Sequence, residues 1–257
     1  MPIHRDATNS VKILNIPIDQ IDLAGVLERC REWLSGSGGH QIATVNPEFV
    51  MTSQRDEKFA HVLQNTALNI ADGVGLLYVS RLLFEKKLYR VTGVELTEQL
   101  AALCGEMGKT IYLVGAGPDV AEQTAEVLKK KHPSLIIVGA EEGIAAGMPE
   151  SEREAANKEL IENIVSVAPD VLLVAFGAPK QDLWIARYLS QLSSVKIAVG
   201  VGGTFDYIAG VVPYAPYWIR TLGLEWLYRL ATQPHRFNRI VTATIRFPLA
   251  ALLNSFK

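Results

Sequence analysis

The chain has 257 residues, of which 49% are hydrophobic and 20% charged, and its formal net charge is −2. This composition is that of a globular protein with one large domain, or one domain and an appendage, and it excludes intrinsic disorder, collagen-like repeats and low-complexity sequence. The N-terminal segment lacks the apolar core and cleavage site of a secretory signal, so we expect the chain to stay in the cytoplasm.

Apolar runs rich in Val, Ile and Leu alternate along the chain with longer segments of helical periodicity. Strands are predicted over residues 11–16, 41–45, 68–71, 110–115, 134–140, 170–177 and 196–203. Helices are predicted over residues 22–34, 47–54, 118–132 and 178–192. The strands are continuously hydrophobic, which is typical of strands covered on both faces. The sequence therefore predicts an α/β fold with a mostly parallel sheet and helices on both faces.

Polar residues and glycines cluster just after five of the predicted strands. They are Thr44 and Asn46, Asp72 and Gly73, Gly115 and Gly117, Lys180 and Gln181, and Thr204 and Asp206. In open α/β sheets, ligands bind at the carboxyl ends of the strands. We therefore expect these five strand ends to line one cleft.

The loop that contains Gly115 and Gly117 is similar to part of a dinucleotide-binding site. It joins a predicted strand to a predicted helix, and the next strand is followed by Glu141 and Glu142, which could hold a ribose. The third glycine of the usual fingerprint is missing, however, and Pro118 explains the loop as a tight turn with Pro at the first helical position. An NAD-dependent oxidoreductase therefore stays an alternative.

The sequence contains none of the common motifs for metal or cofactor chemistry. It has no Walker A lysine motif, no HExxH, no G-x-S-x-G elbow and no Asp-x-Asp for a metal-held diphosphate. Cys30 and Cys104 lack CxxC spacing and a nearby His, so we expect buried thiols in a reducing compartment. We expect no metal and no cofactor, so that Arg or Lys would neutralise any bound phosphate.

The alternation of strands and helices stops after residue 210. Residues 211–257 carry five Arg and one Lys against one Glu, a balance of +5, which leaves −7 for residues 1–210. The last apolar stretch, 240–256, is interrupted by an Arg and a Pro and is too short to span a membrane. We therefore divide the chain into an α/β core, residues 1–210, and a basic helical appendage, residues 211–257, that lies in a membrane interface. An appendage packed on its own core or on another subunit is the alternative, which leaves open whether the chain forms a homo-oligomer.

Seven blocks of the sequence carry a resemblance to a known family. They are "TVNPE" (44–48), "ADGVG" (71–75), "RVTGVEL" (90–96), "LVGAGPDVAE" (113–122), "FGAPKQDLWI" (176–185), "VGVGGTFDYIAG" (199–210) and "GLEWLYRLATQPHRFNRI" (223–240). In order and spacing they resemble the WecG/TagA/CpsF glycosyltransferases over nearly the whole chain.

The resemblance implies an inverting, metal-independent enzyme with a Rossmann-like α/β core and a C-terminal appendage that helps to complete the site at the membrane. Such an enzyme moves a sugar from a UDP-sugar to a polyprenyl-diphosphate-linked sugar during cell-surface polymer synthesis, at the inner face of the cell membrane. In wall teichoic acid members, the donor is UDP-N-acetylmannosamine and the acceptor is lipid-linked N-acetylglucosamine. Other members use a mannosaminuronic acid or a glucose donor.

The resemblance also implies roles for individual residues. The matching positions are Thr44 and Asp72 for the catalytic pair, Arg90 and Gln181 for the substrate pocket, and Arg229, Arg236 and Arg239 for the arginines that reach the diphosphate. We add Asn46 and Gly73, which neighbour the catalytic pair, as substrate-binding residues. The chain departs from the family at Pro213 and Tyr214, where a basic residue and an Arg are usual, so the role of that arginine is in doubt here.

Asp72 is the predicted general base, because a partly desolvated carboxylate at a strand end accepts a proton more readily. Asp206 is the second candidate. Each predicted site residue also has a simpler alternative role: a helix cap for Asp72, local backbone contacts for Thr44 and Asn46, an exposed helix position for Gln181, an ion pair with Glu95 or Glu98 for Arg90, and lipid phosphates alone for the three appendage arginines.

Two other classes of protein compete with a glycosyltransferase. One is the NAD-dependent oxidoreductase, and the other is a non-catalytic adaptor that binds a membrane surface through the basic appendage. Nucleic acid is not an expected partner, because the acidic core would repel it and the arginines are few.

Overall fold

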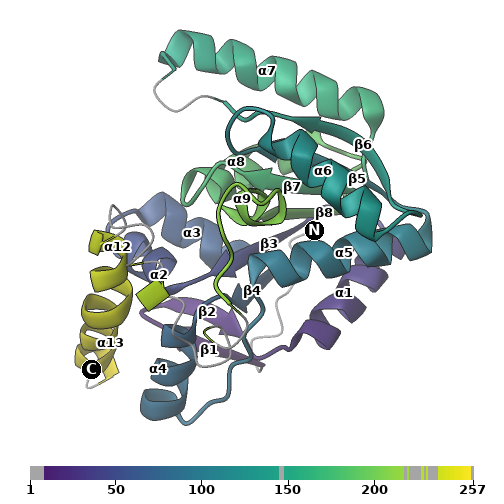
Figure 1. Ribbon diagram of the computed structural model, residues 1–257. Helices are drawn as coiled ribbons and strands as arrows, with labels where there is room; N and C mark the ends of the chain where they lie inside the picture. The colour runs from purple at the N-terminus through teal and green to yellow at the C-terminus, as the bar shows by residue number, and fades with distance from the viewer. Residues whose placement is uncertain are drawn as a thin grey trace.

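The computed structural model describes residues 9–144, 148–216 and 237–255, together with residues 219, 227, 228 and 230. In this part of the chain, six parallel strands form one sheet in the order β4-β3-β8-β7-β5-β6 (Figure 1). They are β3 (His40–Val45), β4 (Leu68–Ala71), β5 (Thr110–Gly115), β6 (Ile136–Glu141), β7 (Val171–Ala175) and β8 (Ile197–Gly200). The predicted α/β fold with a parallel sheet is confirmed.

Helices cover both faces of this sheet (Figure 1). On one face lie α1 (Leu23–Ser35), α5 (Gly93–Met107), α6 (Val120–Lys131) and α9 (Thr204–Ile208). On the other face lie α3 (Glu57–Asn65), α7 (Glu150–Val167) and α8 (Lys180–Tyr188), which continues as a 3-10 turn (Leu189–Gln191). The helices α2 (Pro47–Ser53) and α4 (Val74–Phe84) extend this second layer beyond β3 and β4.

Strand β5 shows why the strands are apolar at every position. Its Ile111 and Leu113 are buried in the cluster that contains α1 and α5, whereas Tyr112 and Val114 are buried with α7 and α8. Consecutive side chains of a strand point to opposite faces. A strand covered on both sides therefore needs apolar side chains throughout.

The single strand predicted over residues 11–16 is wrong. Leu14 and Asn15 adopt positive φ angles of 48° and 67°, so the chain turns back and forms an antiparallel hairpin of β1 (Ser10–Ile13) and β2 (Ile16–Asp19). Two turn residues at positive φ match the right-handed twist of a hairpin. The hairpin is a separate sheet beside β4 and does not extend the parallel one.

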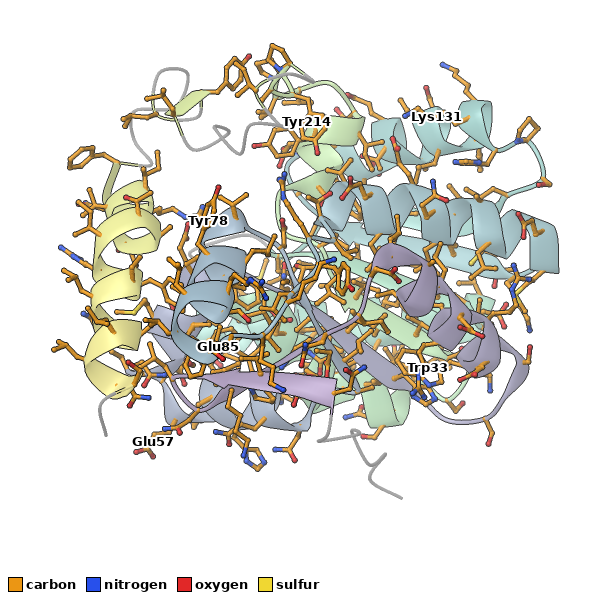
Figure 2. The ribbon with its side chains drawn as sticks, turned by 90° about the horizontal axis from the view of Figure 1, so that it is seen from below. Trp33, Glu57, Tyr78, Glu85, Lys131 and Tyr214 are labelled. Carbon is orange, nitrogen blue, oxygen red and sulfur yellow. The ribbon has the colours of Figure 1, made fainter. Side chains whose placement is uncertain are left out.

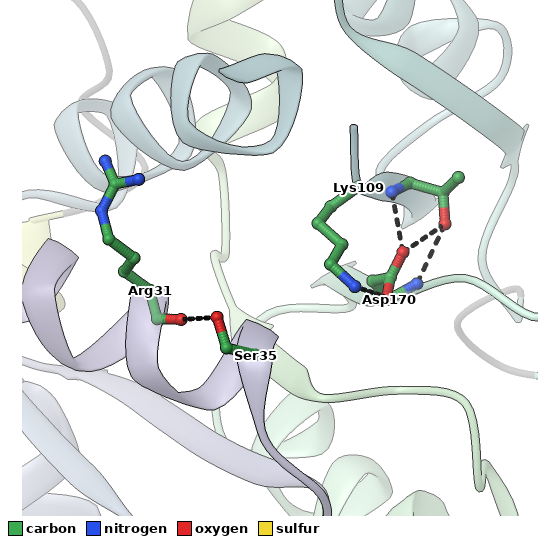
Figure 3. A network of polar contacts seen from close by, with 5 residues as sticks. Arg31, Ser35, Lys109 and Asp170 are labelled. Carbon is green, nitrogen blue, oxygen red and sulfur yellow. Dashed lines mark hydrogen bonds and ion pairs between the residues drawn. The ribbon is translucent and has the colours of Figure 1, made fainter. Parts of the chain in front are cut away.

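Asp170 holds the amino ends of β5 and β7 in register (Figure 3). Its Oδ2 accepts hydrogen bonds from the Thr110 N–H at 3.0 Å and the Thr110 hydroxyl at 3.1 Å, and its Oδ1 lies 3.2 Å from Lys109 Nζ. Burial opposes ionisation of this carboxyl, but the contacts with Thr110 and Lys109 outweigh it and lower the pKa of Asp170. This contact lies at the end of the sheet opposite the carboxyl ends of the strands.

The two cysteines are buried thiols on α1 and α5, as predicted. Burial raises the pKa of Cys30 and of Cys104 to about 12, so both stay protonated at neutral pH. Among the described residues, no group of three or more His, Cys, Asp or Glu side chains is arranged to hold a metal ion.

The described C-terminal stretch of the predicted appendage, residues 237–255, is helical and packs on the core. It contains α12 (Phe237–Val241), a π-helical segment (Thr242–Arg246) and α13 (Phe247–Ser255), and α13 lies against α2 and α4 (Figure 1). Phe247 and Ala251 are buried in the same cluster as α2 and α4. Within the described residues, no helix is both long enough and apolar enough to cross a membrane.

Candidate active site

A cavity of about 430 Å³ opens at the carboxyl ends of the neighbouring strands β4, β3, β8 and β7. We call it the strand-end cavity. Thr44 of β3, Asp72 after β4, Gln181 after β7 and Thr204 after β8 all line it. Four of the five strand ends expected to form one cleft therefore do so. A cavity of this size at this edge of a parallel sheet can hold a small ligand.

A second cavity, of about 390 Å³, lies between α4 and the C-terminal helices. We call it the apolar cavity, because its walls include Val74, Val79 and Leu82 of α4 and Ile240, Ala243 and Pro248 of the C-terminal helices. Among the described residues, the two cavities share Asn46, Glu48, Asp72, Arg90 and Arg239. The charged side chains of the site therefore stand at the boundary between the two cavities.

Main-chain contacts place Asp72 and Arg90 at this boundary. The Asp72 N–H donates to the Val45 carbonyl at 2.7 Å and so extends the pairing of β4 with β3. Arg90 forms a parallel bridge with Ala71, and the Val91 N–H donates to the Ala71 carbonyl at 3.0 Å. The chain returning from α4 is thereby laid alongside the end of β4, where a guanidinium and a carboxylate line the same space.

Asp72 is not the N-cap residue of the helix that follows it. The N-cap position of α4 is Gly73, which has a φ of 140° and lines the apolar cavity. The helix-cap alternative for Asp72 therefore stays open. The role of Asp72 as general base stays a prediction, and Asp206, the second candidate, lines neither cavity.

Thr44 and Asn46 line the strand-end cavity and also make the local contacts that the sequence left open. The buried Thr44 hydroxyl donates to the Gly200 carbonyl of β8 at 2.9 Å. Asn46 caps α2, and its Oδ1 accepts from the N–H groups of Glu48 and Phe49 at 2.9 and 3.1 Å. The lone pairs of the Thr44 hydroxyl and the Nδ2 amide of Asn46 are the groups that these residues still offer a ligand.

Gln181 is only 1% exposed, so the alternative of an exposed helix residue is wrong. Its Oε1 accepts a hydrogen bond from the Gly202 N–H at 2.9 Å, which ties the start of α8 to the turn after β8. The adjacent Lys180 is exposed and lines neither cavity. Gln181, rather than Lys180, therefore belongs to the site.

Arg239 is brought to the boundary by an ion pair with Glu48 of α2. Its Nε lies 2.6 Å from Glu48 Oε2, and the two side chains are 52% and 29% exposed. A pair this exposed contributes at most about 1 kcal/mol, so it orients Arg239 more than it stabilises the fold. The other two predicted appendage arginines, Arg229 and Arg236, lie outside the described residues.

Arg90 lines both cavities. Of the two carboxylates that the sequence offered as its ion-pair partners, Glu95 forms a capping box with Thr92 at the start of α5, and Glu98 pairs with Lys131 of α6. The ion-pair alternative for Arg90 stays open.

The sequence matches the model of the glycosyl transferase WecG/TagA/CpsF family over residues 11–257. The chain belongs to this family. It is 31% identical to the N-acetylglucosaminyldiphosphoundecaprenol N-acetyl-beta-D-mannosaminyltransferase of Bacillus spizizenii, over 88% of this chain and 86% of that protein. Enzymes of the same name from Bacillus subtilis (29% identity, 90% and 86% covered) and Staphylococcus aureus (26%, 94% and 92%) are also similar. The chain is therefore a glycosyltransferase, and the oxidoreductase and adaptor alternatives are not supported.

The Gly115-x-Gly117 loop of this WecG/TagA/CpsF glycosyltransferase lines neither cavity. Gly115 has a φ of 115°, and a Cβ there would lie 2.7 to 2.9 Å from main-chain atoms of Ala175. The glycine is needed because the ends of β5 and β7 approach closely. The fifth predicted strand end thus has a structural explanation, and the prediction that it lines the cleft is wrong.

Among the residues that line the strand-end cavity of this glycosyltransferase without a site role predicted from the sequence are Glu48, Tyr207 and Tyr214. The Tyr207 and Tyr214 rings are 5.2 Å apart and tilted by 53°. By the resemblance described above, Tyr214 stands at the position where an Arg is expected, so an aromatic ring lines the cavity there. Glu48 lies in the "TVNPE" block, but its partner Arg239 is 191 positions away and could not be read from that block.

Proposed function

We propose that this glycosyltransferase moves N-acetylmannosamine from its UDP derivative to N-acetylglucosamine carried on a polyprenyl diphosphate, in the synthesis of a cell-surface polymer of the wall teichoic acid type. The observation that carries the proposal is the boundary of Asp72, Arg90 and Arg239 between the strand-end cavity and the apolar cavity. Transfer from a water-soluble nucleotide sugar to a lipid-linked sugar needs two such spaces that meet at the reacting atoms. The names of the three relatives, which give this sugar and this acceptor, support the same substrates.

The strand-end cavity is the proposed site of the UDP-sugar. Its edge carries the Tyr207 and Tyr214 rings, which offer a flat apolar surface for the uracil. Gln181, Asn46 and Thr44 supply amide and hydroxyl groups for the sugar hydroxyls and the phosphates. In the proposed donor complex, the anomeric carbon faces the shared boundary.

Arg90 and Arg239 are the proposed partners of the diphosphate. The leaving UDP gains negative charge as the glycosidic bond breaks, and fixed cations at that position stabilise the transition state. Both guanidinium groups line the cavity boundary, and each belongs to a segment held by the core, one through the bridge to Ala71 and one through Glu48. We propose that they replace a metal ion in this role.

Asp72 is the proposed general base of an inverting displacement. Its carboxylate takes the proton from the acceptor hydroxyl while the hydroxyl oxygen bonds to the anomeric carbon and the bond from that carbon to the UDP oxygen breaks. The products are the β-linked disaccharide on its lipid, UDP and a protonated Asp72, which returns its proton to water. The position of Asp72 in both cavities supports this role, because the base must reach the acceptor beside the donor.

The apolar cavity is the proposed entry of the lipid-linked acceptor, with the enzyme attached peripherally to the inner face of the cell membrane. Tyr78 and Leu82 of α4 line this cavity and are 62% and 77% exposed, and Leu249 and Leu253 of α13 are 55% and 69% exposed. Figure 2 shows α4, with Tyr78, beside the C-terminal helix. An apolar surface on two adjacent helices supports insertion into the membrane interface close to the acceptor.

A turnover assay with a panel of UDP-sugars tests the proposal. The full-length enzyme is incubated with each donor and a detergent-soluble, lipid-diphosphate-linked N-acetylglucosamine, in the presence of a chelator. We expect transfer from UDP-N-acetylmannosamine and a β linkage in the product. Transfer from another donor alone would change the assigned sugar, a requirement for added metal would contradict the role of the arginines, and no transfer from any donor would contradict the proposal.

A further inference from the structure

Asp182, the third residue of α8, carries a buried carboxyl that the proposed reaction does not use. The residue is 0% exposed, and neither carboxyl oxygen accepts a hydrogen bond of normal geometry from the described residues. Burial of such a group costs free energy unless the environment compensates it. The presence of a buried carboxyl at this position therefore needs a physical explanation.

The carboxyl lies against Gly200 at the end of β8, beside Gln181, which lines the strand-end cavity. A Cβ built on Gly200 would lie 2.8 Å from Asp182 Oδ1 and 2.7 Å from the Nε2 of Gln181. The Gly200 carbonyl accepts the hydrogen bond of the Thr44 hydroxyl. The side chains of Thr44, Gln181 and Asp182 therefore all contact the main chain of Gly200. Thr44 and Gln181 also line the strand-end cavity.

Further hydrogen bonds make this meeting point rigid. The Gln181 Oε1 accepts from the Gly202 N–H at 2.9 Å, and the main-chain carbonyl of Asp182 accepts from the Gln41 Nε2 at 3.1 Å. The amide of Gln181 is thus fixed by Gly202 on one side and packs with the Asp182 carboxyl against Gly200. A movement of the Asp182 side chain would be passed to Gln181 and to the end of β8.

From this packing we propose that Asp182 is a positioning residue, whose carboxyl holds the Gln181 amide and the end of β8 in the arrangement that receives the donor. The inference rests on the proposed donor site. It goes beyond that site because Asp182 does not line the strand-end cavity and acts through its neighbours.

The charge of Asp182 gives the role a measurable consequence. Burial raises the pKa of this carboxyl to about 7, against a smaller opposing effect of the Gln181 and Gln41 amides. Below pH 7 the group is neutral, and above it a negative charge appears beneath the site of a diphosphate. Ionisation therefore both disturbs the packing at Gly200 and repels the donor.

Few other titratable groups lie near enough to mask this effect. Of the elements packed against α8, β7, β8 and the 3-10 turn carry no titratable side chain, and His40 lies at the opposite end of β3. The titratable residues of α3 are exposed: Glu57, Lys58 and His61. On α8 itself, Lys180 and Arg187 are exposed, and the buried Tyr188 lies at the far end of the helix.

The test is the affinity for UDP-N-acetylmannosamine, measured by titration calorimetry from pH 6 to pH 8.5, a range in which the charge of its diphosphate is constant. We expect the Kd of the wild-type enzyme to rise about tenfold across this range, and the Kd of Asp182→Asn to change less than about threefold, because the amide cannot ionise. Asp119→Asn, at an exposed position outside both cavities, should keep the wild-type profile.

Equal pH profiles in the wild type and in Asp182→Asn would overturn the role of Asp182 while leaving the donor site intact. No binding by the wild type at any pH would overturn the proposed function, and the role of Asp182 with it. If Asp182→Asn fails to fold, infrared difference spectra of the wild type with ¹³C-labelled aspartate decide the matter. A protonated carboxyl band that shifts on donor binding supports the role, and an unchanged band overturns it.

Discussion

Asp72 is held in place by its main chain, through the hydrogen bond from its N–H to the Val45 carbonyl and the bridge between Ala71 and Arg90. The N-cap position of the helix that follows it is Gly73, and the Asp72 carboxylate lines both cavities. Because main-chain contacts position the residue, a change of its side chain tests the function of the carboxylate separately from its position.

Asp72→Asn should keep the fold and reduce kcat by at least about 100-fold, because an amide cannot take the proton of the acceptor hydroxyl. The measurement is turnover with the detergent-soluble acceptor, with the thermal unfolding midpoint as the check on folding. Asp119→Asn is the matched control, since Asp119 is exposed, makes no cap hydrogen bond and has a φ of 60° that Asn tolerates. Activity of Asp72→Asn above about a tenth of the wild-type value would remove Asp72 as the base.

Asp182 should make the stability of the wild-type protein depend on pH. Its pKa is raised from 3.8 to about 7 in the folded state, so between these values the folded protein keeps a proton that the unfolded chain releases. The stabilisation is fully present below pH 3.8 and falls by about 1.4 kcal/mol per pH unit until pH 7. Urea unfolding of the wild type and Asp182→Asn at pH 5 and pH 8 should show the variant gaining relative stability at pH 8; a constant difference would contradict the raised pKa.

At the scale of the element, the C-terminal helices bring two exposed arginines to different surroundings. Arg239 of α12 lines both cavities and pairs with Glu48, whereas Arg246 of the π-helical segment lines neither. Both are cations on the same helical stretch. Their comparison therefore separates a role in the reaction from a general attraction to anionic lipid.

Arg239→Gln should lower kcat with the detergent-soluble acceptor by about 10- to 100-fold, because a cation that stabilises the leaving diphosphate is removed. Arg246→Gln should leave this turnover unchanged. On anionic phospholipid vesicles, each variant should bind a few-fold more weakly, as expected for the loss of one surface cation at about 1 kcal/mol. Loss of vesicle binding by Arg239→Gln with full turnover on the soluble acceptor would show that this arginine binds lipid phosphates only.

Helix α4 forms one wall of the apolar cavity and carries part of the exposed apolar surface. Leu82→Glu should weaken binding to anionic vesicles at least tenfold, because inserting one Leu side chain into an apolar phase is worth about 2 kcal/mol. Val165→Glu on α7 is the control, since Val165 is also about half exposed, at 50%, but lies on a helix that contacts neither α4 nor α13 in Figure 1. Equal vesicle binding by both variants, measured by co-sedimentation, would argue against α4 as a membrane-facing helix.

At the scale of the whole molecule, Phe247 joins the C-terminal helix to the core. It is fully buried in the cluster that contains α2 and α4, and these two helices follow β3 and β4, the strands at whose carboxyl ends Thr44 and Asp72 lie. Packing of the C-terminal helix therefore fixes both the wall of the apolar cavity and the position of Arg239. The position of Arg239 therefore depends on this packing as well as on the ion pair with Glu48.

Phe247→Ala should reduce the free energy of unfolding by about 3 to 5 kcal/mol, as for other large-to-small changes in a core. It should also lower turnover, because α12 and Arg239 are attached through α13. Leu253→Ala, at a side chain that is 69% exposed, should change stability by less than about 0.5 kcal/mol. Wild-type turnover in a destabilised Phe247→Ala would show that the packing of α13 is not needed to form the site.

Several site residues could be found from the sequence because their positions depend on local patterns. Thr44 lies at the end of an apolar run, and Asp72, Gln181 and Thr204 each come after one; in a parallel sheet every such run ends at the same edge. The same reasoning failed for Gly115, since a glycine after a strand also serves a close backbone approach. It failed again at Leu14 and Asn15, because these residues form a hairpin turn within a run whose apolar composition predicted a single strand.

The α/β class, the parallel sheet with helices on both faces, and the strand ends that build the site could all be predicted from the sequence. The reason is that a strand buried on both faces is apolar at every position, and such a run of residues is recognised locally. Only the tertiary structure decided which strand ends adjoin, that Glu48 meets Arg239, that Asp182 lies buried beneath Gly200, and that two cavities share Asp72. These features depend on the order of strands in the sheet and on the packing of the last helix. Both are set by contacts between residues far apart in the chain, which no local pattern encodes.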